Sequence, residues 1–591
     1  MKKKVLIIGA GPAGLAAAHE LLARGAERYE VVVLEASHEV GGISRTAVHH
    51  GLRMDMGGHR FFSKEPRVVK WWHERMPLQG APAKDDIALG REIPLAAGGP
   101  DPESCDRVML CRRRLSRIYY GHALFDYPLS LSAATMRQLG TGRMAKVAAS
   151  YLAARLHPLP EDSLENFYIN RFGRTLYEIF FEGYTEKLWG RHPREIDAAW
   201  GAQRVKGLSV SAVLRDALAS RLPRREGKRN GGAAGREGNP DGNDMAAGDL
   251  RGGGMGADSL RGGNGGGTHV ETSLIHSFEY PKLGPGQLWE QTAREIEEMG
   301  GTLEFGKRVC ELREDAAAGD AERAGNSKSE RTENGPAKNG SAQTGAAPAP
   351  VTLLCDDGSS YTADFVISTM PLKDLVAAMD EVPTRIKKIA GALPYRSFLT
   401  AGLLTDRLAL PRTPKSRGLG GLVGDNWIYV QDTSVKLGRI QIFNNWSPYL
   451  LPDPEHTVWL GLEYFCDEGD EFWSADDAAI VAQAHEELAR IGVLSPDAPV
   501  LDSHVVRVPK AYPAYFDSYA HIDELAAWLD ARPWLLCAGR NGQHRYNNMD
   551  HSMMTGFLCA DALLDPSFHR ARIWKVNTEQ SYQEDARTPA P

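Results

Sequence analysis

The chain opens with a short apolar run, a glycine-rich turn and an amphipathic helical pattern. Residues 5–8 read Val-Leu-Ile-Ile, glycines follow, and residues 15–24 carry apolar side chains at helical spacing. A second strand-like run over residues 30–34 is apolar after its first residue and is followed by Glu35. Short continuous apolar runs are typical of strands buried on both faces of a parallel sheet. The pattern therefore predicts a strand–turn–helix–strand unit at this end of the chain.

The same residues imitate a secretory signal peptide, because the basic residues 2–4 precede the apolar stretch. His19 and Glu20 lie in that stretch at positions where a signal sequence stays apolar. We therefore favour the buried strand over an export signal.

The spacing of the first glycines points to a dinucleotide. Gly9, Gly11 and Gly14 follow the pattern G-x-G-x-x-G, and Glu35 lies 21 residues beyond Gly14. In such units the first glycine permits a tight turn, the second lets the backbone approach a pyrophosphate, and the third lets the helix pack on the strand. The helix N-terminus, with Ala13 in its first turn, offers free N–H groups to phosphates, and the acid binds ribose. Glycines that merely form turns are the alternative.

The residues after Glu35 favour FAD over NAD. Two further clusters follow in the sequence: Gly41, Gly42 and Arg45, then Gly57, Gly58 and His59. The first would give close backbone approach and a cation for an extended diphosphate, and the second could lie against a flat ring system. In this order the motifs resemble those of the flavoprotein superfamily of amine oxidases, protoporphyrinogen oxidases, phytoene desaturases and UDP-galactopyranose mutases. The resemblance implies that FAD is the cofactor.

A second strand–loop–helix pattern lies near the C-terminus. Residues 534–538 form an apolar run, a polar loop spans 539–550, and residues 552–564 have helical character. Asp550 or Ser552 would cap that helix, whose N-terminus would stabilise negative charge on a reduced flavin. No cysteine lies in the loop itself, because Cys537 is on the preceding strand. We therefore expect FAD to be bound non-covalently.

The remaining cofactor elements are a predicted hairpin and a buried strand. Residues 301–305 and 351–354 read as strands, and residues 364–371 as a buried strand followed by a turn of small residues. The resemblance adds cofactor contacts that spacing alone does not give: Val309 at the adenine, with Gly539, Asn548 and Met549 in the C-terminal loop. For the residues between 301 and 371, hairpin geometry alone is an equally good explanation.

An aromatic helical stretch over residues 171–190 is the candidate substrate region. An aromatic stripe is usually core, but rings with polar tips suit a cleft. The stretch resembles the substrate helix of the UDP-galactopyranose mutases, which implies substrate-binding roles for Phe180, Tyr184, Thr185, Lys187 and Trp189. The mutase arginine that grips the diphosphate would fall on Gln203 here, so Arg204, one place further on, is its candidate.

The C-terminal loop resembles the mutase loop in part. Arg540, Tyr546 and Met549 match it, whereas His544 and Asn548 replace a tyrosine and an aspartate. The chain also resembles bacterial FAD-dependent oxidoreductases of unassigned substrate, which share the motif at 280–286 and the Arg-Tyr-Asn-Asn sequence.

Two stretches have a composition that does not suit a folded core. Residues 224–270 are rich in glycine and lack aromatic side chains, and residues 314–350 contain mainly small and charged residues up to the final proline. Neither can bury enough apolar surface to offset the entropy lost on ordering. We expect both to be disordered insertions.

Composition limits the class of protein. The 591 residues predict more than one domain, and a net charge of −7 gives no basic footprint for nucleic acid. No apolar run is long enough to span a bilayer. The seven scattered cysteines contain no Cys-x-x-Cys pair, so neither a disulfide framework nor a metal site is predicted, and a cytoplasmic location fits best.

The predicted fold is α/β, with a doubly wound, Rossmann-like FAD domain and an inserted substrate domain. The cofactor domain is assembled from residues 1–78, 274–376 and 500–565. The substrate domain combines a helical part, 120–223, with a β-rich part, 377–499, and residues 566–591 form a tail.

Three functions stay open. The first is a two-electron oxidation of a small molecule over FAD, with His59, Arg540 and Tyr546 as candidate catalytic residues. The second is a mutase-like reaction without net redox change, in which reduced flavin acts on a nucleotide-linked sugar. The third is flavin binding without catalysis.

Overall fold

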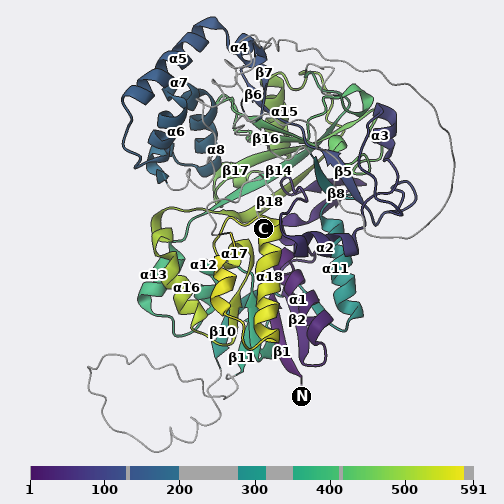
Figure 1. Cartoon of the computed structure of the whole chain (residues 1–591), viewed down its shortest axis with the longest axis vertical. Helices are drawn as coiled ribbons and strands as arrows, with labels where there is room; N and C mark the ends of the chain where they lie inside the picture. Colours follow the sequence, from purple (N-terminus) through teal and green to yellow (C-terminus); the bar gives the residue numbers. More distant parts are fainter. Residues whose placement is uncertain are drawn as a thin grey trace, which may run out of the picture. The chain divides into compact units, whose positions relative to one another are not determined.

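The computed structural model describes residues 2–127, 129, 133–198, 277–314, 350–410 and 417–577 (Figure 1). The predicted insertion at 224–270 lies outside these residues, and so does the one at 314–350 apart from its two end residues. Arg204 also lies outside them, and the predicted tail is described only as far as residue 577.

A five-stranded parallel sheet forms the cofactor part of the fold, in the order β19-β13-β1-β2-β9. Its strands are β1 (Lys3–Ile8), β2 (Tyr29–Glu35), β9 (Thr302–Phe305), β13 (Phe365–Ser368) and β19 (Leu535–Cys537). Every neighbouring pair in this order is parallel, as a doubly wound sheet requires. The predicted α/β fold is therefore confirmed.

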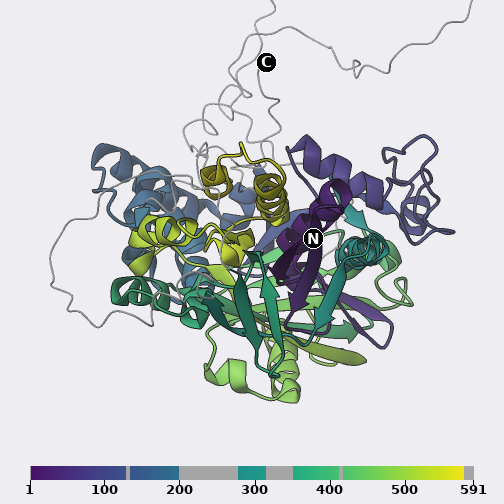
Figure 2. The ribbon, with the colours of Figure 1, turned by 90° about the horizontal axis from the view of Figure 1, so that it is seen from below.

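Both faces of this sheet are covered, which explains why its strands are continuously apolar. Val5 and Ile7 face the helices on one side, while Leu6 and Ile8 face the other. The first side is covered by α1 (Pro12–Gly25), α11 (Gly286–Glu298) and α18 (Met549–Leu564), and Figure 2 shows α11 in teal beside the purple N-terminal unit. The second side is covered by α12 (Leu372–Ala378), α13 (Thr384–Gly391), α16 (Ile522–Asp530) and the antiparallel sheet of β10 (Val309–Glu314), β11 (Val351–Cys355) and β12 (Ser360–Ala363).

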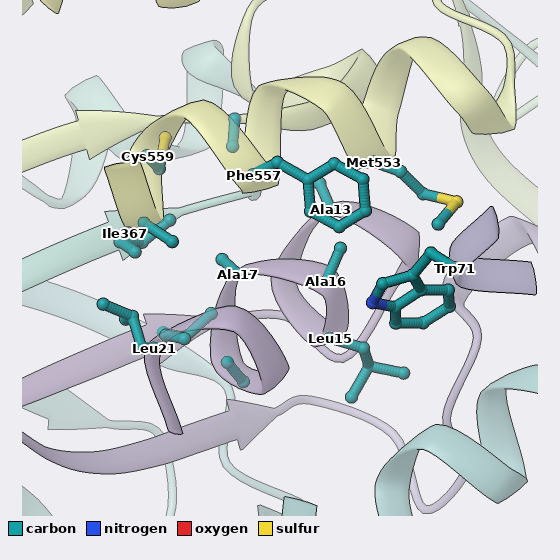
Figure 3. Packing of buried hydrophobic residues seen from close by; sticks show 14 of the residues in the cluster. Ala13, Leu15, Ala16, Ala17, Leu21, Trp71, Ile367, Met553, Phe557 and Cys559 are labelled. Atoms are coloured by element: carbon teal, nitrogen blue, oxygen red, sulfur yellow. The ribbon is translucent and has the colours of Figure 1, made fainter. Parts of the chain in front are cut away.

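Helices α1 and α18 pack together at the level of their backbones. A Cβ atom added to Gly556 of α18 would lie 2.2 Å from the carbonyl oxygen of Ala13 in α1. A Cβ atom on Gly14 would lie 2.0 Å from the carbonyl oxygen of Gly9, as the predicted role of Gly14 requires. Around these contacts, Leu15, Ala17 and Phe557 form part of a continuous buried cluster (Figure 3). The C-terminal helix is thus fixed beside the first turn of the chain.

Helix α18 begins earlier than the sequence suggests. Its N-cap is Asn548, not Asp550 or Ser552, and His551 at the third helical position completes a capping box with it. The Asn548 side chain accepts from the helix backbone while the Asn548 amide donates to His551 Nδ1, at 3.2 Å. The sequence pattern did not predict this start, because the residue at the third helical position of a capping box is usually glutamate or glutamine rather than histidine.

A second, seven-stranded sheet has the order β18-β14-β17-β16-β15-β6-β7. Its strands are β6 (Ser116–Tyr120), β7 (Ala123–Asp126), β14 (Tyr395–Thr405), β15 (Trp427–Val430), β16 (Arg439–Ile442), β17 (Val458–Cys466) and β18 (Asp502–Pro513). Helix α15 (Asp477–Arg490) packs on one face, and α14 (Glu471–Ser474) lies near its start. Strands β6, β7 and β18 fall outside the predicted β-rich range of 377–499. These strands come from the segments before and after that range and pair with its strands. The pattern of apolar residues along the chain does not show which distant segments pair.

Helices follow β7 in the predicted helical part. They are α4 (Ala133–Leu139), α5 (Thr141–Leu156), α6 (Leu164–Phe172), α7 (Arg174–Tyr177) and α8 (Gly183–Trp189). A π-helical turn over Glu178–Glu182 joins α7 to α8. The aromatic stretch is therefore helical, as expected, but its period changes in the middle.

Short elements connect the two large sheets. They are the hairpin of β3 (Thr46–His49) and β4 (Leu52–Asp55), the pair β5 (Met109–Arg113) and β8 (Ser277–Pro281), and helices α2 (Pro66–Arg75), α3 (Lys84–Leu89) and α17 (Gly539–Gly542). Asp55, at the end of β4, is completely buried and bonded to the hydroxyls of Tyr280 and Thr46. Burial raises the pKa of this carboxyl to about 8, against the effect of the two hydroxyls. In the described part of the chain no helix could cross a bilayer.

The first prediction tests the packing of α1. Gly14→Ala places a methyl group against a backbone oxygen that cannot move aside, and overpacking of this kind costs about 1–3 kcal/mol. We expect a lower melting temperature and weaker flavin retention. Gly142→Ala in α5 is the control, because a Cβ atom there meets nothing within 4 Å. Equal melting temperatures for the two variants would contradict the packing argument.

The second prediction concerns pH. Because the pKa of Asp55 is higher in the folded state than the value of about 4 in an unfolded chain, folding takes up a proton between those values. Asp55 therefore lowers stability progressively as the pH rises from about 4 to about 8. Asp55→Asn keeps the shape and a neutral polar group. The melting temperature of the variant minus that of the wild type should increase as the pH rises through this window and stay constant above it. A difference that does not change with pH would rule out the buried neutral acid.

Candidate flavin and substrate site

The first glycine turn forms an open cradle at the N-terminus of α1. Gly9 has φ +100°, Gly41 has φ +100° and Gly42 has φ +54°, in the left-handed region that favours glycine. A Cβ atom on Gly42 would lie 3.2 Å from Gly11 Cα, so the two segments cross backbone to backbone. Within 4 Å, the one described residue that a Cβ atom on Gly11 would meet, its chain neighbours and own helix aside, is Gly42. The space beside Gly11 is therefore available to a ligand, as the predicted diphosphate role requires.

Glu35 is held against this turn. One carboxylate oxygen accepts from the amide of Ala10 at 2.7 Å, and the other accepts from the amide and hydroxyl of Ser37 at 2.9 and 2.8 Å. The acid is thus fixed at the carboxyl end of β2, beside the glycine turn. This is the position at which a dinucleotide fold binds ribose.

The other predicted cofactor residues lie around the same sheet edge. Arg45 pairs with Glu39 at 3.0 Å and donates to the carbonyl of Gly42. Val309 is buried at the start of β10. Gly539 has φ +82°, and a Cβ atom on it would lie 3.1 Å from Ala13. Met549 is buried in the first turn of α18, next to the cap residue Asn548.

The segment containing Gly57, Gly58 and His59 contacts the seven-stranded sheet. A Cβ atom on Gly58 would lie 2.0 Å from the Trp427 ring, so this glycine is needed for packing whatever else it does. Gly57 has φ +81°, and its missing side chain would point toward Phe398. Trp427 Nε1 is buried and has no hydrogen-bond partner among the described residues. A buried donor of this kind could donate a hydrogen bond to a polar ligand bound beside Gly58.

His59 is neutral near pH 7 in this environment. Its Nδ1 is buried and finds no partner in the described part of the chain. Burial, and then the nearby Arg540 guanidinium, lower its pKa to about 4. A proton-transfer role near neutral pH, as the sequence suggested, is thus disfavoured, whereas a neutral hydrogen-bonding role is available.

Arg540 follows directly after Gly539, at the end of β19. Its Nε donates to the carbonyl of Asn547 at 2.8 Å, and its Nη1 donates to the carbonyl of Ala511 at 2.9 Å. The guanidinium lies over the Tyr546 ring at 4.6 Å. Among the described residues its hydrogen-bond acceptors are backbone carbonyls, so no acid of this loop neutralises its charge. Arginine in this state is available to an anionic or polar ligand.

The seven-stranded sheet presents a polar inner face toward these groups. Ile440 and Leu462 face α15, whereas Arg439 and Glu463, their neighbours along the strands, point the opposite way and are almost fully buried. Arg439 donates to Glu463 at 3.0 Å, to the Tyr184 hydroxyl at 2.7 Å and to the Tyr512 hydroxyl at 3.2 Å. Burial raises the pKa of Glu463, against the opposing effect of Arg439.

Aromatic rings connect Arg439 to Arg540. Tyr512 stacks on Tyr546 with ring centres 5.6 Å apart, and Trp189 lies edge-on to Tyr546 at 6.5 Å. The Arg439 guanidinium lies 5.3 Å from the Trp427 ring centre. Three predicted residues, Tyr184, Trp189 and Tyr546, are thus brought together with Arg540.

Other predicted substrate residues have structural roles. Phe180 packs against Tyr120 and Phe125 in the protein interior. Thr185 is buried. Lys187 donates to the carbonyls of residues 430, 432 and 437, and burial lowers its pKa to about 8. The contacts of Phe180 and Lys187 are thus with residues other than those around Arg540.

Sequence reasoning missed Arg439, Glu463 and Tyr512. A signal was present, because Arg439, Gln441 and Glu463 are polar residues within otherwise apolar strands, and such residues are seldom buried without a partner. Their pairing depends on strand register, which places Arg439 opposite Glu463.

Comparisons with known proteins agree with this geometry. Residues 7–75 match the family model described as NAD(P)-binding Rossmann-like domain, and residues 341–564 match the one described as flavin containing amine oxidoreductase. Together with the open glycine cradle, these matches identify FAD as the cofactor.

Individual relatives match over short segments. Polyamine oxidase 1 of Oryza sativa subsp. japonica is 48% identical over 56 residues, which are 10% of this chain and 11% of that protein. Protoporphyrinogen oxidase 2, chloroplastic/mitochondrial, of Arabidopsis thaliana is 42% identical over 66 residues, or 11% and 12% of the two chains. The matches thus span about a tenth of the length of these curated relatives.

The fold is similar over almost the whole length to a solved structure. The crystal structure of reduced UDP-galactopyranose mutase has a TM-score of 0.65 and 18% identity, and the match covers 98% of this chain and 97% of that one. At this identity the likeness concerns the fold alone. The two family models and this likeness agree on one fold, in which a Rossmann-like dinucleotide-binding unit is combined with a region similar to flavin containing amine oxidoreductases.

Proposed function

We propose that this protein is an FAD-dependent oxidoreductase that carries out a two-electron oxidation of a small molecule. The observation that carries the proposal is the cluster of Arg540, Tyr546, Tyr512, Trp189 and the Arg439–Glu463 pair beside the segment containing Gly57 and His59. Buried polar groups in an aromatic setting are typical of a substrate site. A protein that only stores flavin has no need of such a cluster.

The cofactor would be held non-covalently by the residues around the cradle. In this proposal, Gly9, Gly11, Gly14 and Ala13 form the diphosphate turn, and Glu35 binds the ribose. The remaining contacts would come from Gly41, Gly42, Arg45, Gly57, Gly58, Val309, Gly539, Asn548 and Met549. When bound, FAD supplies a ring that accepts a hydride or two electrons.

The chain's own residues would bind and orient the substrate. Arg540 offers a charge whose partners in its loop are carbonyls, so it suits an anionic or strongly polar group. Tyr546 and Trp189 exclude water beside it. His59, neutral at pH 7, would serve as a hydrogen-bonding partner through Nδ1 rather than as an acid.

A mutase-like reaction on a nucleotide-linked sugar is the second candidate. The observation that favours it is a pair of guanidinium groups, Arg439 and Arg540, separated by tyrosine rings, because planar guanidinium groups suit phosphate oxygens. Against it, Lys187 and Phe180, which match the mutase substrate helix, are engaged elsewhere.

One experiment separates the two reactions. The purified protein is mixed anaerobically with polyamines, protoporphyrinogen or UDP-galactose, and flavin absorbance is followed. An oxidoreductase substrate bleaches the oxidised flavin, and air restores the colour. Mutase chemistry instead converts the sugar only after the flavin has been reduced beforehand, with no net consumption of reductant. Bound flavin that responds to no compound of either class would favour simple binding.

The third prediction tests Glu35. Glu35→Ala leaves the amides of Ala10 and Ser37 without their carboxylate acceptor and removes the proposed ribose contact. The variant should bind FAD more weakly by about 1–3 kcal/mol, measured by titrating apoprotein with FAD. Glu30→Ala, on the same strand but exposed to solvent, is the control and should bind FAD normally. Unchanged affinity in Glu35→Ala would remove this residue from the site.

The fourth prediction tests Arg540. Arg540→Lys should keep the yellow colour, while flavin reduction by an identified substrate slows roughly 10–100-fold, because a hydrogen bond to a charged group contributes about 1.5–3 kcal/mol. Arg545→Lys is the matched control, since Arg545 also donates to carbonyls from this loop but faces residues 574 and 576. Equal rates in both variants would show that Arg540 only stabilises the loop.

Tyr546→Phe extends this test. The loss of one hydroxyl should slow reduction by roughly fivefold, the equivalent of about 1 kcal/mol. His59→Ala should shift the flavin absorbance spectrum and the reduction potential. An unaltered spectrum with full activity would place neither side chain at the flavin.

A further inference from the structure

We propose that His49, His50 and Asp502 form a binding site for one divalent transition-metal ion, with Zn²⁺ as its simplest occupant. The three residues lie where the β3–β4 turn meets the start of β18. Among the described residues, they are the group of three potential ligands whose donor atoms all lie within 4.8 Å of one another. The proposal is independent of the reaction that the flavin carries out.

The donor atoms already have the spacing of a metal site. His49 Nε2 lies 3.1 Å from one carboxylate oxygen of Asp502, and His50 Nδ1 lies 3.0 Å from the other. In a tetrahedral zinc site with bonds of about 2.0–2.2 Å, neighbouring ligand atoms are about 3.3 Å apart. An ion could therefore replace the two hydrogen bonds with only a small displacement of the side chains.

The side chains come from backbone that is fixed by pairing. His49 lies opposite Leu52 in the β3–β4 hairpin, and Asp502 lies opposite Leu404 in the seven-stranded sheet. The His49 ring also stacks on His504 of β18, with ring centres 4.7 Å apart and planes 11° apart. Ligands positioned in this way lose little freedom when an ion binds.

His50 has a left-handed backbone conformation, which a turn can accommodate with other residues than histidine. Its φ is +47°, in the left-handed region where a non-glycine residue is uncommon. Asparagine or glycine would suit this position at lower cost. His50 brings a second imidazole to Asp502. The presence of histidine at this position is therefore better explained by its side chain than by the turn.

Charge and access also favour a cation. Asp502 supplies a carboxylate that faces both imidazoles, and one of its oxygens also accepts from the Ser503 amide at 2.7 Å. The side chains of His49 and Asp502 are 26% exposed and that of His50 is 73% exposed. An ion can thus enter from solvent and complete its coordination with water. Two imidazoles and a carboxylate suit Zn²⁺, Cu²⁺ or Ni²⁺ better than Mg²⁺ or Ca²⁺.

A bound ion would join the two large parts of the fold. Strand β4 leads into Gly57, Gly58 and His59, and β18 belongs to the sheet that carries Tyr512. Hydrogen bonds that already connect them include those from Trp459 Nε1 to the carbonyl of Arg53, at 2.9 Å, and from the Arg53 amide to the carbonyl of Leu450, at 2.8 Å. The ion would strengthen this connection and should raise the temperature at which flavin is released.

The test uses untagged, flavin-loaded protein stripped with a chelator and titrated with Zn²⁺ by calorimetry. We expect one ion per chain, a higher flavin-release temperature, and a Cu²⁺ electron paramagnetic resonance spectrum that shows two coordinated imidazole nitrogens. Mg²⁺ and Ca²⁺ should give no such response.

His50→Asn and Asp502→Asn should each abolish stoichiometric binding. The asparagine at position 50 tolerates the left-handed backbone, so the turn is kept, and flavin content checks that both variants are folded. His456→Ala is the control, because it removes an exposed histidine paired with one acid, Asp453, at 2.9 Å. Binding that does not saturate, or that is as strong in both site variants as in the wild type, overturns the proposal.

Discussion

The contact between the backbones of α1 and α18 is the constraint on which the flavin part of the structure depends. Gly556 allows α18 to meet the Ala13 carbonyl, and Gly14 allows α1 to meet the Gly9 carbonyl. A side chain at Gly556 would push α18 away from α1, and one at Gly14 would push α1 away from the turn that follows β1. Because α18 is fixed in this way, the loop that precedes it carries Gly539 and Arg540 to the first glycine turn. Residues separated by more than 500 positions thus share one site, and neither end of the chain can form it alone.

The seven-stranded sheet supplies the second half of the site by having two different faces. Its outer face packs on α15 and is apolar, whereas the inner face carries Arg439, Gln441 and Glu463. A buried charge is costly unless it is paired, and these two charges neutralise each other while Gln441 donates to the acid at 2.9 Å. The wall is therefore polar but without net charge. In the proposed reaction, selectivity for a charged substrate would thus depend on Arg540 rather than on Arg439.

The sequence predicted the cofactor part of the fold well because its signals are local. A glycine turn between an apolar run and a helix has few other uses, and the order of Gly9, Glu35, Gly41 and Gly57 along the chain is itself informative. The start of α18 was wrong by a few residues, since His551 acts in a capping box that pattern reading does not include.

The substrate part was harder to predict because it depends on register and on pairing between distant segments. The aromatic helix contained both Tyr184, which bonds to Arg439, and Phe180, which is core. Four residues apart on a regular helix, the two side chains would share one face, so no spacing rule could assign them different roles. Likewise, the pairing of β18 with β14 cannot be predicted from the pattern of apolar residues.

A π-helical turn at Glu178–Glu182 changes the helical period between these two residues. A π turn contains one residue more than an α turn, so it rotates everything after it by about 100° relative to what precedes it. Phe180 lies within this turn and packs against Tyr120 and Phe125, whereas Tyr184 follows it and accepts a hydrogen bond from the Arg439 guanidinium. A one-residue deletion here would restore a regular helix and carry the tyrosine hydroxyl away from Arg439. A relative of this protein that lacks the extra residue would consequently need a different partner for that arginine, and the number of residues in this turn is a marker by which such relatives can be sorted.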